Sequence, residues 1–146
     1  MHSSRSYWQD TLAAGLVAAV TSGAPSTLYA WLSGDDWLEA TRAAGAMLIA
    51  VDASTPELLA AATLVHLSVS LFWAAVLAGT LPRRHVIMTA TIAAAAIAVL
   101  DLRVLGPLFP EVYALSFWPQ FADHLAWGIT AGAVLAWRWR RATAER

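Results

Sequence analysis

The chain has 146 residues, a length that suits a single domain. Hydrophobic residues make up 59% of it and charged residues 13%, which is too apolar for an ordinary soluble domain of this size. There is no lysine, and the net charge of -1 gives no indication of nucleic-acid binding. The absence of cysteine excludes disulfides, thiolate metal sites and cysteine nucleophiles. The sequence therefore predicts an all-α integral membrane protein.

Four apolar stretches are long enough to cross a bilayer as helices, which takes about 20 residues each. They cover residues 11–31, 57–80, 86–105 and 121–137, within a single transmembrane domain of residues 1–146. The first stretch also resembles a signal peptide with a small-residue cleavage site in TSGA, but Pro25 would directly follow the cut. We therefore expect a retained helix and a membrane-embedded four-helix bundle.

The placement of arginines predicts how these helices are oriented. Arg83 and Arg84 lie in the short link between the second and third helices. The C-terminal tail adds Arg138, Arg140, Arg141 and Arg146. The link after the first helix has five acidic residues against Arg42 alone. By the positive-inside rule, both termini lie in the cytoplasm and this acidic link lies outside.

Tryptophans mark the predicted helix ends. Membrane proteins place such rings in belts at the two bilayer interfaces. The tryptophans at these positions are Trp8, Trp31, Trp118, Trp137 and Trp139. Their positions agree with the four predicted spans.

The first external link is too long for a plain turn. Within it, residues 37–50 begin polar and end apolar, which predicts a short helix in the outer membrane interface. The link after the third helix contains Pro107, Pro110 and Pro119 among aromatic residues, so we expect an ordered cap over the outer end of the bundle.

Small residues recur every four positions in each predicted span. This spacing lets helix backbones approach closely in lipid, where packing drives association. The positions are Gly15, Ala19 and Gly23; Ser70, Ala74 and Ala78; Ala90, Ala94 and Ala98; and Gly128 and Gly132. A compact bundle is the expected result, and the same faces also suit a homo-oligomer or a larger membrane complex.

Three ionisable residues lie at one predicted depth. His66, Asp101 and His124 are each about 14 or 15 residues from a cytoplasmic helix end, which places them roughly 21 Å from the cytoplasmic end of the bundle. Asp123 and Arg103 lie close to this level. The first helix reaches it near Pro25, where Ser22 and Ser26 offer hydroxyl groups. All four helices thus contribute to a predicted polar layer in the outer half of the membrane.

Three interpretations of this layer stay open. The first is a buried hydrogen-bonded cluster of His66, Asp101, His124 and Arg103 that fixes helix register. The second is a proton-responsive or small-solute site, because histidine titrates between about pH 5 and 8. The third is a haem or divalent-metal site ligated by His66 and His124. Trp127, one turn beyond His124, belongs to the same candidate site and favours packing over a cofactor role.

No motif indicates an enzyme. Ser70 lies one turn from His66, but no nucleophile elbow, oxyanion loop or phosphate-binding glycine loop accompanies it. We expect this serine to bond the backbone carbonyl one turn back in its own helix. The sequence therefore predicts a non-enzymatic protein.

Four segments of the chain resemble the YagU-type family of small bacterial inner-membrane proteins. They are AAGLVAAVTSGAPSTLYAWL, LVHLSVSLFWAAVLAGTLPRR, LGPLFP and FADHLAWGITAGAVLAWRWRR. The positions that match are His66, His124 and Trp127. The resemblance implies a multi-pass protein of the bacterial inner membrane and a link to acid tolerance, and the shorter chain with its acidic first link is a departure from that family.

Together these observations predict an envelope or acid-stress protein, or an accessory subunit of a membrane complex. A small proton-coupled transporter acting as an oligomer is the alternative, with Asp101 as the coupling carboxylate.

Overall fold

A computed structural model describes residues 4–144, so Arg146 of the tail lies outside the described residues. Within that range every element is helical. The elements are α1 (Ser4–Ser22), α2 (Ala24–Ser33), α3 (Glu39–Gly45), α4 (Thr55–Thr80), α5 (Val86–Val99), the π-helical turn η1 (Leu100–Leu105), the 3-10 turn η2 (Gly106–Leu108), α6 (Pro110–Tyr113) and α7 (Phe117–Ala144). The all-α prediction is confirmed.

Three helical segments in the described range are long and apolar enough to cross a membrane: Tyr7–Ser33, Thr55–Thr80 and Val86–Leu108. They correspond to the first three predicted spans. The predicted fourth span lies within α7, which has 28 residues but is not among the three. Polar side chains such as Asp123 and His124 lower its mean hydropathy.

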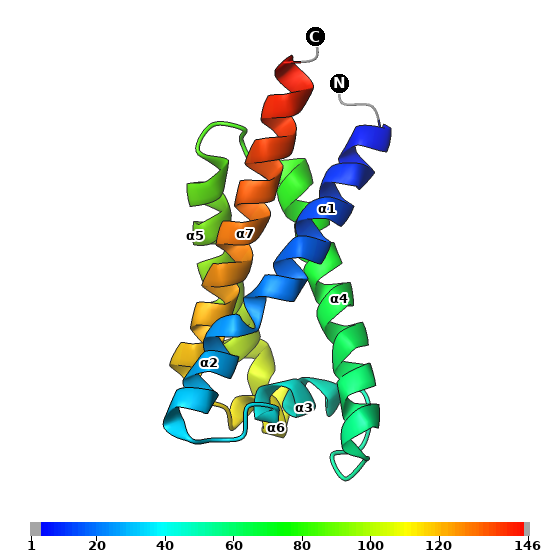
Figure 1. Cartoon of the computed structure of the whole chain (residues 1–146), viewed down its shortest axis with the longest axis vertical. Helices are drawn as coiled ribbons and strands as arrows, with labels where there is room; N and C mark the ends of the chain where they lie inside the picture. Colours follow the sequence, from blue (N-terminus) through cyan, green and yellow to red (C-terminus); the bar gives the residue numbers. More distant parts are fainter. Residues whose placement is uncertain (1–3, 145–146) are drawn as a thin grey trace.

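The long helices run side by side along the length of the molecule (Figure 1). Both ends of the described chain lie at one end, together with the link between α4 and α5, and we call this the terminal end. The short helices α3 and α6 lie at the opposite end, which we call the loop end. Helix α7 packs against α5 and α1, and α1 also packs against α4.

Small residues hold α5 and α7 together. A Cβ atom added to Gly128 would lie 2.4 Å from Cβ of Ala94, and one added to Gly132 would lie 2.8 Å from Cα of Ile87. Ala90 and Ala94 are fully buried in this contact. The predicted small-residue faces of these two helices are packing surfaces, because neither glycine has room for a side chain.

The predicted small-residue face of the first helix is only partly correct. Gly15 packs on α4, where an added Cβ would lie 2.8 Å from Cδ2 of Leu71 and 3.2 Å from Cβ of Ala74. Gly23 instead has no atom within 4 Å of an added Cβ. The helices have separated by this level, so the assignment of Gly23 to a packing face is wrong.

The first predicted helix is broken at Gly23, between α1 and α2. Pro25 lies in the first turn of α2, has no backbone N–H and cannot continue the hydrogen bonding of α1. The carbonyl oxygen of Gly23 accepts a hydrogen bond from the backbone nitrogen of Thr27 at 3.2 Å. The first turn of α2 therefore presents backbone N–H groups inside the bundle.

Three further features differ from the sequence-based expectations. The helix predicted for residues 37–50 is shorter, covering only Glu39–Gly45, and Gly45 docks it so closely that an added Cβ would lie 2.1 Å from the backbone oxygen of Leu58. The third helix changes from α to π geometry at Leu100. Trp139 is buried rather than interfacial, whereas the other tryptophans predicted at helix ends are exposed: Trp8, Trp31, Trp118 and Trp137.

Candidate functional site

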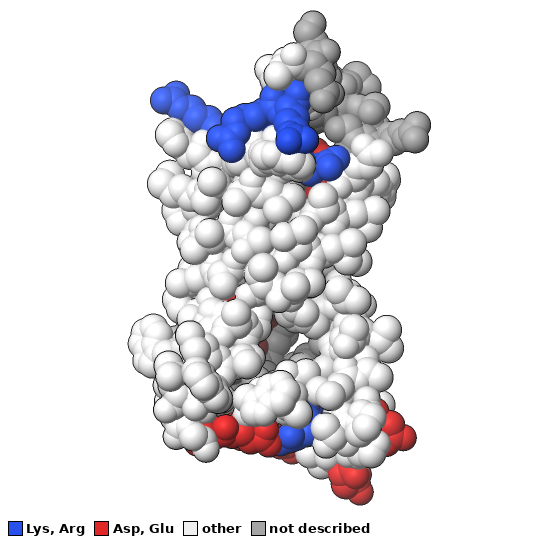
Figure 2. Space-filling model, in the orientation of Figure 1, with Lys and Arg blue, Asp and Glu red and all other residues white. Residues whose placement is uncertain are grey.

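A cleft opens on the side of the bundle near the loop end, between α2, α4 and α7. It has a volume of about 710 Å³, and the surface is hollowed at this place (Figure 2). We call it the side cleft. Its walls include Thr27 and Trp31 of α2, Thr63 and His66 of α4, and Asp123 of α7. Part of α3 borders it through Ala40, Thr41 and Ala44.

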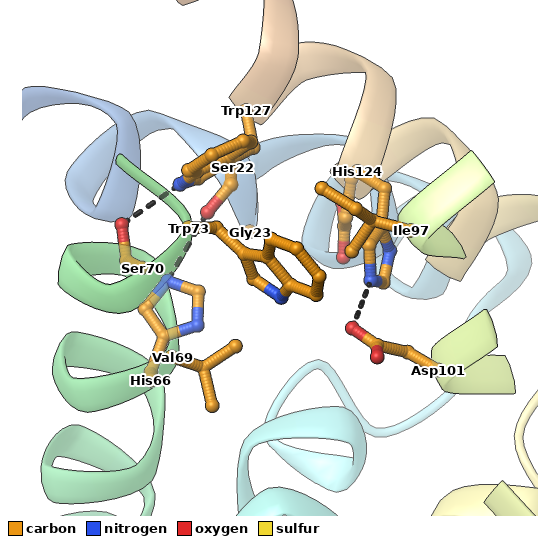
Figure 3. Close-up of a pocket in the computed structure, with 11 residues that line it drawn as sticks. Ser22, Gly23, His66, Val69, Ser70, Trp73, Ile97, Asp101, His124 and Trp127 are labelled. Atoms are coloured by element: carbon orange, nitrogen blue, oxygen red, sulfur yellow. Dashed lines mark hydrogen bonds and ion pairs between the residues drawn. The ribbon is translucent and has the colours of Figure 1, made fainter. Parts of the chain in front are cut away.

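A smaller cavity of about 120 Å³ adjoins the side cleft and shares His66, Asp123 and His124 with it. We call it the tryptophan cavity, because Trp73 and Trp127 line it (Figure 3). Asp101 also lines this cavity, so the structure brings all the predicted site residues except Arg103 to one place. The predicted meeting of four helices at one depth accounts for this convergence.

The His124 side chain lies between two hydrogen-bond acceptors. Its Nδ1 atom is 2.8 Å from the backbone oxygen of Gln120, so Nδ1 carries a hydrogen and donates it. Its Nε2 atom is 3.3 Å from Oδ2 of Asp101. In a neutral imidazole this second nitrogen would be an acceptor facing a carboxylate oxygen. The contact between His124 and Asp101 therefore requires one further proton, carried by either partner.

The π-helical turn places Asp101 for this contact. Such turns widen the helix by one residue and are frequent at functional sites. Both side chains of the pair are 25% exposed, so the pair is neither sealed in the core nor free in solvent. It remains accessible from the cavity.

Asp123 caps the break between α1 and α2. Its Oδ1 atom accepts a hydrogen bond from the backbone nitrogen of Ser26 at 2.9 Å. The first turn of a helix has unpaired N–H groups and a partial positive charge, which together favour a carboxylate. This contact gives Asp123 a structural reason to lie within the bundle, separate from any role in binding.

His66 lies on the opposite wall and contacts α1. Its Nε2 atom is 2.9 Å from the backbone oxygen of Ala19 and 3.1 Å from Oγ of Ser22. Because the carbonyl oxygen can only accept, Nε2 carries the hydrogen and Nδ1 is left as an acceptor in the neutral ring. His66 is exposed, since it borders the side cleft.

Trp127 joins three helices through hydrogen bonds. Its Nε1 atom donates to Oγ of Ser70 at 2.7 Å, and this hydroxyl donates to the backbone oxygen of Gly15 at 2.8 Å. The expectation that Ser70 bonds a carbonyl of its own helix is therefore wrong. The partner lies across the interface because Gly15 brings its backbone against α4.

Arg103 does not join the cluster. Its guanidinium lies 4.3 Å from the centre of the Phe117 ring, and the residue is exposed. The single cluster of His66, Asp101, His124 and Arg103 is corrected accordingly. His124 pairs with Asp101, and His66 bonds separately to α1.

The residues present do not fit the metal sites considered from the sequence. No three His, Asp or Glu side chains in the part of the chain that the structure describes are arranged to hold a metal ion. Both ring nitrogens of His124 and Nε2 of His66 are occupied by contacts within the protein. The tryptophan cavity is also much smaller than a porphyrin. A haem between these histidines would require the helices to rearrange.

A second polar cluster, at the terminal end, was not anticipated from the sequence. Asp10 is 5% exposed and accepts hydrogen bonds from Nε of Arg138 at 2.5 Å and from Nε1 of Trp139 at 2.9 Å. We call these three residues the terminal clamp. The only sequence signal was an acidic residue just before the apolar part of the first helix, opposite a tail rich in arginine.

Comparison with known proteins gives no further assignment, since no family model, curated protein or solved structure matches the chain.

Proposed function

We propose that this chain is a four-span protein of a bacterial inner membrane, with both termini in the cytoplasm. Its role is non-enzymatic: the side cleft opens outward and takes up protons from outside the cell, in response to acid or another envelope stress. The observation that carries the proposal is the contact between His124 and Asp101, which requires a proton and lies at a cavity adjoining this cleft.

Charge distribution supports the orientation. Arginines gather at the terminal end and acidic residues at the loop end (Figure 2). The positive-inside rule then places the terminal end in the cytoplasm and the loop end outside. Helix α7 serves as the fourth span because its polar side chains have partners within the bundle: Asp123 on Ser26 and His124 on Asp101. Such pairing is what makes ionisable residues tolerable in a membrane.

Protonation of His66 changes the width of the side cleft. The titratable groups that line the side cleft and the tryptophan cavity with His66 are Asp101 from η1 and Asp123 and His124 from α7, while α1 and α2 contribute the hydroxyls of Ser22, Ser26 and Thr27. A proton on Nδ1 makes the imidazole cationic, and it is then attracted to these carboxylates. Helix α4 is drawn toward α2 and α7, which narrows the side cleft.

The contact of His66 with Ser22 does not support hydrolysis. A catalytic histidine accepts the proton of its serine, so its facing nitrogen must lack a hydrogen. Here Nε2 of His66 donates to the backbone oxygen of Ala19, to which Oγ of Ser22 also donates at 3.2 Å. The serine proton is thus directed away from the histidine. This arrangement favours a non-enzymatic role.

The proposal is tested by measuring the width of the side cleft against pH. The chain has no cysteine, so spin labels can be attached at Leu28→Cys on α2 and Leu64→Cys on α4, both exposed. We expect the distance between labels to shorten as the pH falls from about 8 to 5. The additional substitution His66→Gln should abolish the change.

A second label pair provides the control for this experiment. Leu12→Cys on α1 and Met88→Cys on α5 lie in the half of the bundle nearer the terminal end and are exposed. Their distance should not vary with pH. A constant distance between the labels on α2 and α4 would contradict the proposal, as would an equal change in both pairs.

A proton-coupled transporter that acts as an oligomer is the second candidate. It is favoured by one observation: the side cleft opens near the loop end, whereas at the terminal end Asp10 and Arg138 join α1 to α7 beside a separate groove of about 870 Å³ lined by α5 and α7. Alternating access requires such an asymmetry. Proton flux into liposomes that contain the protein, lost in Asp101→Asn, would favour transport over sensing. The absence of flux, with the pH response retained, would favour sensing.

A further inference from the structure

We infer that the tryptophan cavity binds a small protonated amine, an alkylammonium ion, in exchange for the proton held between His124 and Asp101. The inference rests on the proposed function in one respect, because the amine reaches the cavity through the side cleft. It names the ligand class that this cleft admits.

Two acceptor atoms at the cavity are left without a partner. Oδ2 of Asp101 contacts His124, but Oδ1 accepts no hydrogen bond from the residues that the structure describes. Nδ1 of His66 is likewise an acceptor without a partner in the described range, since Nε2 of that ring carries the hydrogen. A ligand group that reaches either atom must donate a hydrogen bond to it. An ammonium group has three donors and no acceptor.

The charge of the cavity selects a cation. Asp101 and Asp123 bring two carboxylates to its walls, and no arginine lies among its lining residues. Arg103, on the same turn as Asp101, instead lies over the Phe117 ring. His66 and His124 are the other titratable groups that face the cavity, one from α4 and one from α7. When both imidazoles are neutral, the site carries uncompensated negative charge.

The remaining walls suit an alkyl group beside that cation. Val69 and Ile97 are aliphatic, and the indoles of Trp73 and Trp127 provide aromatic faces. Figure 3 draws the Trp73 indole between His66 and the pair formed by His124 and Asp101. Cations are attracted to the faces of tryptophan rings, most strongly where water is excluded. The walls therefore recognise both ends of a small alkylammonium ion.

The size of the cavity limits the ligand. Its volume is about 120 Å³. A dry cavity of about 150 Å³ in another protein accommodates benzene. An amine with three or four carbon atoms therefore fits, whereas a larger one would extend into the side cleft. We take propylammonium as the probe.

The exchange balances in charge. Before binding, one proton between His124 and Asp101 neutralises one carboxylate. The ammonium group then takes the place of that proton: one N–H donates to Asp101 and another to Nε2 of His124, and the displaced proton leaves through the side cleft to solvent. Neutral His124 keeps its bond to Gln120. One proton is thus released for each amine bound, and the net charge of the site is unchanged.

The test is calorimetric titration of the full chain in mild detergent near neutral pH, in weak buffer with a pH indicator, against detergent alone as the blank. Propylammonium should bind and release about one proton per protein. Tetramethylammonium has the charge but no donor, and 1-propanol has one donor but no charge. Each should bind at least about tenfold more weakly, because each lacks one of the two required features.

Two matched variants localise the binding. Asp101→Asn keeps a hydrogen bond, since its amide can donate to Nε2 of neutral His124, but removes the charge and the stored proton. This variant should abolish both the heat of propylammonium binding and the release of a proton. Asp52→Asn makes the same change at an exposed turn of the loop end and should leave both intact. If Asp101→Asn does not fold, Val69→Phe fills the cavity with an apolar ring and should also abolish binding.

Each outcome separates this inference from the proposed function. If propylammonium binds no better than tetramethylammonium or 1-propanol, or if Asp101→Asn retains binding, the inference is overturned. The pH-dependent label distance can still hold in that case, because it depends on the attraction of protonated His66 to the carboxylates and not on a bound amine. If the label distance is constant while the amine binds with release of a proton, the proposed response fails and the amine site stands.

Discussion

The same helices form both halves of the bundle, but they pack closely in one half and separate in the other. Toward the terminal end, Gly132 presses α7 against α5, and no side chain fits between them. Near the loop end, Gly23 has open space beside it and the side cleft separates α4 from α2. The contrast shows that the spacing of small residues in a sequence does not by itself determine where helices touch.

The polar groups of the two halves differ in the same way. Asp10 has an arginine and an indole as partners, which balance its charge and satisfy both carboxylate oxygens. Asp101 has one imidazole, shares a proton with it and keeps an oxygen free toward a cavity. A satisfied buried carboxylate fixes helices in place, whereas one with a free oxygen is suited to binding. We therefore assign a structural role to the terminal end and a functional role to the loop end.

Breaking the terminal clamp should have the largest effect on stability. Asp10→Ala leaves Arg138 without its partner, and we expect the free energy of unfolding to fall by roughly 3 kcal/mol. Unfolding in mixed micelles measures this loss. The double variant with Arg138→Met should recover most of the stability, because it removes the unpaired charge and keeps the volume. Failure of the double variant to recover would contradict a simple ion-pair role.

Adding one methyl group at the contact between α5 and α7 should destabilise the fold strongly. Gly128→Ala places a Cβ atom 2.4 Å from Cβ of Ala94, so α5 and α7 must separate. We expect a loss of about 2 kcal/mol. Gly23→Ala is the matched control at the break between α1 and α2, where the backbone has φ -75° and no atom lies within 4 Å of an added Cβ. It should be neutral or slightly stabilising, and equal effects at both sites would remove the contrast.

The hydrogen bonds that join Trp127, Ser70 and Gly15 should contribute less to stability. Trp127→Phe removes the donor to Ser70 but leaves the serine bound to Gly15. Loss of one such bond costs about 1 kcal/mol. Thermal unfolding of this variant should be compared with that of Trp118→Phe, which alters an exposed ring. A larger loss at Trp118 would contradict the assigned role of the link.

The smallest expected effect concerns Asp36 in the loop before α3. The Arg42 guanidinium donates to its carboxylate and lowers the pKa of Asp36, with a further bond from the backbone nitrogen of Leu38 at 2.9 Å. Because folding favours the charged form, this contribution is fully present above the ordinary pKa of 3.8 and is lost as the pH falls through the lower folded value. A carboxyl titration by NMR should give a midpoint below 3.8 that rises in Arg42→Gln.

Depth along the helices could be predicted from the sequence, but rotation about their axes could not. Counting residues from the helix ends placed His66, Asp101 and His124 at one level, and all three line the tryptophan cavity. The spacing of Ala90 and Ala94 indicated a packing face of α5, but not which helix would meet it. The π turn that directs Asp101 toward His124 has no sequence signal comparable to a proline. The direction of Arg103, away from the cluster, depends on the same turn.

Long-range partners were equally beyond a sequence-based prediction. Asp10 and Arg138 belong to opposite ends of the chain, and charge counting assigned the arginine only to the cytoplasmic tail. Pro25 was different, because proline breaks hydrogen bonding wherever it occurs in a helix. It gave a correct indication of polar backbone at this level. Asp123, whose carboxylate accepts a hydrogen bond from the backbone nitrogen of Ser26 at this break, became evident only from the structure.

The proposed orientation requires that the side cleft at the loop end opens to the outside and that the terminal end lies in the cytoplasm. The most direct measurement is labelling of single cysteines in spheroplasts with a maleimide that cannot cross the membrane. Thr63→Cys lies in the side cleft and Thr143→Cys lies near the end of α7. The account predicts that the cysteine at position 63 reacts in intact spheroplasts and the one at 143 only after permeabilisation. The reverse order would contradict the orientation, and protection of position 63 under both conditions would contradict the open cleft.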